Sequence, residues 1–167
     1  MKKFLAYYWL SILLLFALFY WDTSILSLYL NQLQTDLTAL WTSWIVPAEL
    51  MQGHHIIISE DYRLVIEKAC NGMIPYLFFL ASIIAFPSSY WHKIVWALVG
   101  YILLMVVNVL RIGMVTEFVL DGGRQNFSFA HDYIGNSITV ATALFLFILF
   151  VKTRPSLKHS KLSHQAL

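Results

Sequence analysis

The chain has 167 residues, of which 59% are hydrophobic and only 12% are charged, and its formal net charge is +2. A soluble domain carries about 25% charged residues, and half of that share cannot cover the surface of so small a water-soluble protein. The composition therefore predicts an all-α integral membrane protein with one domain over residues 1–167. It argues against a nucleic-acid-binding module and against a disulfide-stapled secreted domain.

The first apolar run covers about residues 4–21 and follows Lys2 and Lys3. A basic start before an apolar run is also the pattern of a secretory signal. This run is longer than such a signal, and no small-residue cleavage site follows it. Aromatic and acidic residues at 20–22 mark an interfacial exit instead. We therefore expect a retained membrane anchor, the first of about four transmembrane helices.

Residues 24–46 predict an outer amphipathic helix that lies at the membrane surface or covers the other spans. Leucine and tryptophan recur at helical spacing along one side, and polar side chains fill the other. The apolar set is Leu26, Leu30, Leu33, Leu37, Leu40, Trp41 and Trp44, and the polar set is Asn31, Gln32, Gln34, Thr35, Asp36, Thr38 and Thr42. Pro47 ends the helix.

Residues 54–67 predict a small extracytoplasmic β-hairpin, because short β-type runs at 55–58 and 63–66 flank a polar turn. The segment contains His54 and His55. Adjacent side chains of a strand face opposite sides, and no second cluster supplies ligands at metal spacing. We therefore expect structural roles for both histidines, and no metal or other cofactor.

Three more apolar runs, at about residues 70–86, 94–118 and 130–151, predict the remaining spans. A glycine-rich loop at 121–129 precedes the last one. The basic tail at 152–167 is predicted to be cytoplasmic. With four spans, both termini share one side of the membrane, which then carries seven of the 11 basic residues and none of the nine acidic ones. This asymmetry predicts cytoplasmic termini.

The same topology places three chemically versatile side chains at the outer ends of the spans. Cys70 opens the second span, and His131 opens the fourth. Arg111 lies 17 residues beyond Ile94, about 25 Å along the third span and near the outer boundary of the bilayer. A thiol, a guanidinium and an imidazole are therefore expected at one depth, where helix packing can bring them together.

Cys70 is the only cysteine, so it cannot form an internal disulfide. One interpretation is a small residue packed at the start of a helix. The other is a reactive thiol, because the N-terminus of a helix stabilises a thiolate. The next residues are Asn71 and Gly72, and the glycine permits the close approach of another backbone or of a substrate.

Arg111 and His131 likewise have two interpretations each. Arg111 either extends its charged end to the interface or, with Asn108 one turn earlier, faces the bundle interior to hold a thiolate or an oxyanion. His131 either caps a helix or exchanges protons with the thiol as a general base and acid. Asp132 is adjacent in sequence, so we expect it to point away from the imidazole.

The sequences Ala-Cys-Asn-Gly-Met at 69–73, Asn-Val-Leu-Arg-Ile at 108–112 and Ala-His at 130–131 together resemble the exosortase/archaeosortase family. The short chain and the Ala-Phe-Pro at 85–87 resemble its exosortase H-type subgroup. These proteins are multi-pass cysteine transpeptidases of the membrane. The resemblance implies that Cys70 is the nucleophile, that Arg111 stabilises the thiolate or the oxyanion, and that His131 transfers protons.

The resemblance also implies the partners and the place of the reaction. The substrates would be secreted proteins that end in a recognition motif, a membrane helix and a basic tail. Cleavage would occur at the outer, periplasmic side of the bacterial inner membrane, and the thioester would pass to an acceptor. Asn71, Gly72 and Asn108 are the expected supporting residues.

Three other functional classes fit the sequence less well. A thiol oxidoreductase normally needs a second cysteine to resolve a mixed disulfide. A haem protein needs histidines paired across helices within the membrane. The remaining alternative is a small non-catalytic transporter or assembly subunit, in which Arg111 is a binding charge and Cys70 is incidental.

Overall fold

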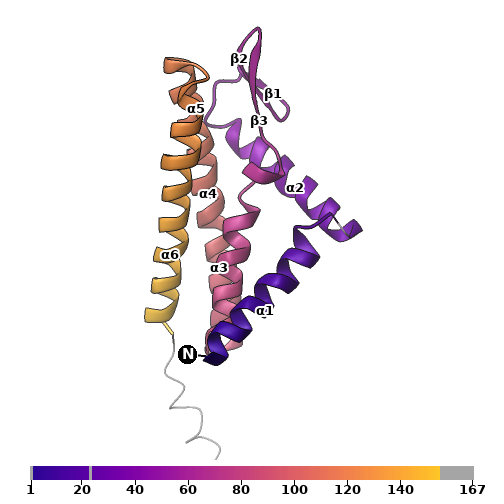
Figure 1. The fold of residues 1–167 in the computed structure, drawn as a ribbon, viewed down its shortest axis with the longest axis vertical. Helices are drawn as coiled ribbons and strands as arrows, with labels where there is room; N and C mark the ends of the chain where they lie inside the picture. The colour runs from indigo at the N-terminus through magenta and orange to yellow at the C-terminus, as the bar shows by residue number, and fades with distance from the viewer. Residues whose placement is uncertain (1, 23, 155–167) are drawn as a thin grey trace, which may run out of the picture.

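A bundle of apolar helices carries a small sheet at one end (Figure 1). The computed structural model describes residues 2–22 and 24–154. The helices are α1 (Lys2–Phe19), α2 (Ile25–Thr42), α3 (Met73–Ala85), α4 (Tyr90–Gly122), α5 (Asn126–Ser128) and α6 (Asn136–Lys152). A 3-10 turn, η1 (Lys68–Cys70), precedes α3, and a π-helical segment, η2 (Phe129–Gly135), joins α5 to α6. Most of the predicted tail lies outside the described residues.

Two helices are long and apolar enough to cross a membrane by length and composition. They are Tyr90–Gly122 and the continuous segment Asn126–Lys152, with 33 and 27 residues. The other two apolar helices are shorter, and the 13 residues of α3 extend only about 20 Å. The hydrocarbon core is about 30 Å thick. The predicted arrangement of four spans therefore stays a prediction, with two spans of full length among the described residues.

Both ends of the described chain lie at the same end of the bundle. Figure 1 shows the start of α1 and the end of α6 together, opposite the sheet. Large apolar side chains are exposed along the bundle, including Trp9 at 60%, Leu98 at 62% and Val140 at 62%. Such a surface suits lipid rather than water.

The α3–α4–α6 contact forms one core of the bundle, and α1 packs against α3 to form another. The first core buries Phe79, Ile83, Leu104, Leu146 and Phe150. The second contains Ile12, Leu15, Leu77 and Ala81. The short helix α3 is thus held on two sides, which fixes the segment that follows Cys70.

The amphipathic helix α2 directs its polar side toward the protein. Its buried residues are Ser27, Asn31, Gln34, Thr35, Thr38, Ala39 and Thr42. Leu26 and Leu40 on the other side are 49% and 52% exposed. The buried threonine hydroxyls donate to carbonyls one turn earlier, at 2.7–2.8 Å. Polar groups lose less by facing partners inside the protein than by facing hydrocarbon, which explains this orientation.

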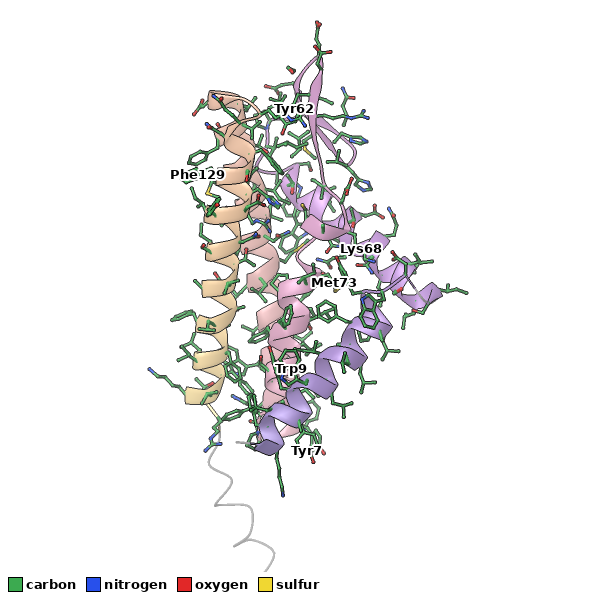
Figure 2. The ribbon with its side chains drawn as sticks, in the orientation of Figure 1. Tyr7, Trp9, Tyr62, Lys68, Met73 and Phe129 are labelled. Carbon is green, nitrogen blue, oxygen red and sulfur yellow. The ribbon has the colours of Figure 1, made fainter. Side chains whose placement is uncertain are left out.

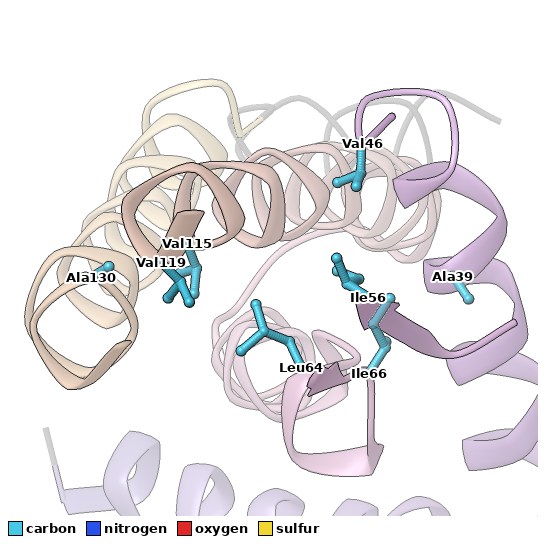
Figure 3. Packing of buried hydrophobic residues seen from close by; sticks show 8 residues of the cluster. All are labelled: Ala39, Val46, Ile56, Leu64, Ile66, Val115, Val119 and Ala130. Atoms are coloured by element: carbon cyan, nitrogen blue, oxygen red, sulfur yellow. The ribbon is translucent and has the colours of Figure 1, made fainter. Parts of the chain in front are cut away.

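The predicted hairpin is a three-stranded antiparallel sheet, with β1 (Met51–Gln52), β2 (His55–Ser59) and β3 (Tyr62–Val65) in that order. β1 has only two residues, too few to show a strand pattern in the sequence. One face of the sheet packs on α4, where Ile56 and Leu64 approach Val115 and Val119 (Figure 3). This contact anchors the sheet beside the outer part of α4.

Candidate active site

Cys70, Arg111 and His131 meet beneath the sheet, each from a different element. The Cys70 Sγ atom lies 3.4 Å from His131 Nε2, and Arg111 Nη2 lies 2.7 Å from the same nitrogen. Cys70 ends η1, Arg111 lies in α4, and His131 lies in η2. In Figure 2, the labels on Tyr62, Lys68 and Phe129 mark the segments β3, η1 and η2 around this site.

Cys70 precedes α3 rather than opening it, so the expected position at the helix N-terminus is wrong. Gly72 adopts a φ of +78°, in the left-handed region, and α3 begins at Met73. This bend of the chain places the thiol outside the first turn of α3, where the helix dipole acts most strongly. Partial burial raises the pKa of the Cys70 thiol, and the nearby Arg111 charge opposes that shift. The thiol therefore needs a base at neutral pH.

His131 is oriented by the carboxylate of its neighbour. Asp132 Oδ1 lies 2.8 Å from His131 Nδ1, and Asp132 Oδ2 accepts a hydrogen bond from Ser128 at 2.8 Å. The Phe127 ring stacks on the imidazole with 4.9 Å between the ring centroids. The expectation that Asp132 points away is wrong. Successive helical residues diverge by about 100°, but a short carboxylate and the Nδ1 atom next to the backbone span that angle.

The hydrogen-bond partners define the proton positions on the imidazole. A guanidinium can only donate, so the His131 Nε2 atom must accept the bond from Arg111. The Nδ1 atom then carries the proton and donates a hydrogen bond to Asp132 Oδ1. A neutral imidazole with its Nε2 lone pair directed at Cys70 and Arg111 is the form that can take a proton from the thiol.

Arg111 is buried, with 8% of its surface exposed. Its Nη1 atom donates to Asn108 Oδ1 at 3.5 Å, and its Nε atom has no partner among the described residues. The side chain crosses directly over Gly135, where an added Cβ would lie 2.6 Å from the Arg111 Nε atom. Gly135 therefore makes room for the guanidinium. The sequence carries no local signal for this role, because the arginine comes from a different helix, α4.

The predicted supporting residues hold the turn that carries the thiol. Asn108 donates to the Cys70 carbonyl at 2.8 Å, and its side chain lies against Gly72. Asn71 is fully buried, and its Oδ1 atom accepts from the Met73 N–H at 3.0 Å. Gln34 of α2, a residue that the sequence placed only on a polar face, donates to the Asn71 carbonyl at 2.9 Å.

The family model for the transmembrane exosortase (Exosortase_EpsH) matches residues 2–149. The chain belongs to the transmembrane exosortase family. The match confirms the predicted family, supports an EpsH-type member, and identifies a membrane protein. No curated protein and no solved structure gives a match.

Cys70, Arg111 and His131 of this exosortase border a cavity of about 160 Å³. Residues 62–66, in and directly after β3, also line it. Apolar side chains provide the remaining wall. The two histidines of the sheet lie elsewhere: His54 pairs with Asp36 of α2 at 2.8 Å. Over residues 2–22 and 24–154, no cluster of three His, Cys, Asp or Glu side chains is arranged to hold a metal.

Proposed function

We propose that this exosortase is a membrane-embedded cysteine transpeptidase that cleaves the C-terminal sorting signal of secreted proteins. The contact of the Cys70 thiol with an imidazole oriented by Asp132 carries the proposal. A nucleophile touches a base, and that base is held in turn by a carboxylate. The buried Arg111 adds a positive charge at the same point.

In the first half of the proposed reaction, the His131 Nε2 atom takes the thiol proton, and the sulfur attacks the carbonyl carbon of the scissile peptide. The carbonyl oxygen becomes an oxyanion, which Arg111 stabilises. His131 then gives its proton to the leaving amine as the C–N bond breaks. The product is a thioester on Cys70. An acceptor amine or water gives a proton to His131 as it attacks the thioester carbonyl carbon, the C–S bond breaks, and the released thiolate takes that proton back from His131.

Arg111 has two partners in this scheme, the His131 Nε2 atom and the oxyanion. The protonation state of His131 decides which of them it binds. The neutral His131 Nε2 atom accepts a hydrogen bond from Arg111. Once Nε2 is protonated, both groups are donors with positive charge, and their contact becomes repulsive. The guanidinium is then free to bind the developing oxyanion.

The membrane supplies much of the binding in this proposal. A substrate helix in the same bilayer would hold its cleavage site at the depth of Cys70 and raise its effective concentration, so a weak recognition contact suffices. Two observations support cytoplasmic termini. Most basic residues of the sequence fall on the predicted side of the termini, and the start of α1 and the end of α6 lie at the same end of the bundle. The site would then face the periplasmic side of the inner membrane.

The test is co-expression with a secreted protein from the same genome that ends in a motif, a membrane helix and a basic tail. Cys70→Ala should abolish processing, and a thioester between Cys70 and the substrate should be trapped in the active protein. Ser82→Ala, which alters an exposed hydroxyl on α3, is the matched control and should process normally. Normal processing by Cys70→Ala would instead favour the non-catalytic transporter or assembly subunit.

A further inference from the structure

We propose that the free edge of β3 is the strand that binds the substrate. An extended peptide would pair with the main chain of Arg63 and Val65 and place an apolar side chain in the cavity beside Cys70. This inference rests on the proposed function, because the occupant is the peptide that Cys70 attacks. It specifies the groups by which this exosortase would select that peptide.

The pairing of β3 identifies which of its backbone groups face outward. The Ile66 N–H donates to the His54 carbonyl at 2.8 Å, so this opposed pair is hydrogen-bonded. Hydrogen-bonded and non-hydrogen-bonded pairs alternate along an antiparallel ladder. The pair at Leu64 is therefore hydrogen-bonded to β2, whereas those at Arg63 and Val65 are not.

The neighbouring strand agrees with this assignment. Ile57, the residue opposite Arg63, directs its N–H away from β3 and donates to the Leu50 carbonyl at 2.8 Å. The N–H and C=O groups of Arg63 and Val65 consequently point to the edge of the sheet. Within the described part of the chain, no other element bonds to them. Such an edge is a template for an added strand.

The cavity is bordered both by this edge strand and by the thiol. All residues from 62 to 66 border it, together with Cys70, Arg111 and His131. The chain reaches Cys70 only five residues after Val65, through η1. A peptide added to β3 would therefore run past the sulfur atom, which is the placement that nucleophilic attack on its carbonyl carbon requires.

The walls of the cavity indicate the kind of side chain that it accepts. Its apolar lining includes Ile56, Leu64, Val65, Ile66, Ile112, Val115 and Phe127. Figure 3 shows Leu64 directed across this region toward Val115. A volume of about 160 Å³ accommodates one aliphatic side chain, and its lining offers no carboxylate to a cationic one. The recognition motif is thus expected to contain an aliphatic residue near the cleavage site.

Proline substitution tests the strand pairing with little effect on the sheet. Val65→Pro removes an outward N–H at a non-hydrogen-bonded edge position, where proline is tolerated. Val65→Thr keeps the N–H and the branched shape, and is the matched control. Arg63→Pro, with Arg63→Lys as its control, removes the other outward N–H and provides an independent variant.

The measurement compares two reagents on Cys70 in the purified, lipid-reconstituted protein. One is an N-acetylated alanine tetrapeptide chloromethyl ketone with a single leucine, and the other is iodoacetamide, which needs only the thiolate. We expect Val65→Pro to slow the peptide reagent about tenfold more than Val65→Thr, near the upper limit for one net hydrogen bond. Iodoacetamide should react equally with both variants. Replacing the leucine of the reagent with lysine should also slow its reaction.

Two results would overturn the strand pairing. One is an equal rate of the peptide reagent with Val65→Pro and Val65→Thr. The other is an equal loss of iodoacetamide reactivity, which would show that Val65 holds the thiol instead of the peptide. Both leave the proposed function intact if Cys70→Ala still abolishes processing. Processing that survives Cys70→Ala overturns the proposed function itself.

Discussion

Gly135→Ala tests whether the contact of Arg111 with His131 matters for the reaction. A Cβ atom at position 135 would lie 2.6 Å from Arg111 Nε and 3.0 Å from its Cδ and Cγ atoms. Unbonded atoms of this kind pack at about 3.5–4.0 Å. The middle of the arginine side chain must therefore move by about 1 Å, which withdraws Nη2 from its 2.7 Å contact with His131.

The substitution is expected to affect the reaction rate and the stability differently. A misplacement of about 1 Å in an active site lowers the rate by about 100-fold. The backbone of Gly135 is already helical, with a φ of −62°, so alanine fits it. Alanine stabilises a helix interior by about 1 kcal/mol relative to glycine, which offsets part of the cost of moving Arg111. We expect a large loss of processing with little change in Tm.

The assay is single-turnover processing of a co-reconstituted tail-anchored substrate, together with thermal unfolding in detergent. Gly113→Ala is the control, because it makes the same change in α4 and its Cβ meets only Ile45 Cγ2, at 3.3 Å. That variant should process at nearly the normal rate. Full activity in Gly135→Ala would refute the requirement for Arg111 in its observed position.

Three other substitutions probe separate parts of the site. Asp132→Asn should lower processing at least about tenfold, because the imidazole of His131 loses its orienting charge. Arg111→Gln should shift the alkylation profile of Cys70 to higher pH, because loss of a positive charge that lowers the thiol pKa lets that pKa rise. Gln34→Leu should lower the free energy of unfolding by about 1–3 kcal/mol, because it removes the acceptor of the Tyr101 hydroxyl and leaves the Asn71 carbonyl with only its longer bond from Thr38.

Each of these expectations has a result that contradicts it. Normal processing in Asp132→Asn would show that the carboxylate has no part in catalysis. An alkylation midpoint that stays constant or falls in Arg111→Gln would contradict the inferred electrostatics. The control for Gln34→Leu is Leu33→Ala, which alters a side chain that is 43% exposed. Equal losses in these two variants would show that α2 is not held by its polar side.

Much of the outline follows from the sequence because it depends on local properties. Apolar runs predict helices in lipid whatever their neighbours are. The rise per residue then places Arg111 at the outer part of its helix, level with Cys70 and His131. Those three residues do meet in the structure. Scarce polar residues in an apolar chain carry much information, because each needs a partner.

Other features depend on side chains that lie far apart in the sequence. A helical pattern shows that α2 has two sides but not which one faces the protein, and the buried contact of Gln34 with Asn71 decides that. Nothing local shows that Gly135 must admit the arginine of another helix. The two residues of β1 become a strand only through their pairing with β2.

The sequence by itself thus determined the membrane class, the family and the identities of the thiol, guanidinium and imidazole. The tertiary structure alone decided which atoms meet. It showed that Gly72 turns the chain before α3, and that Asp132 orients the imidazole. The physical reason is the range of each effect. Hydrophobic periodicity acts within one helix, whereas proton transfer depends on ångström distances set by packing among several elements.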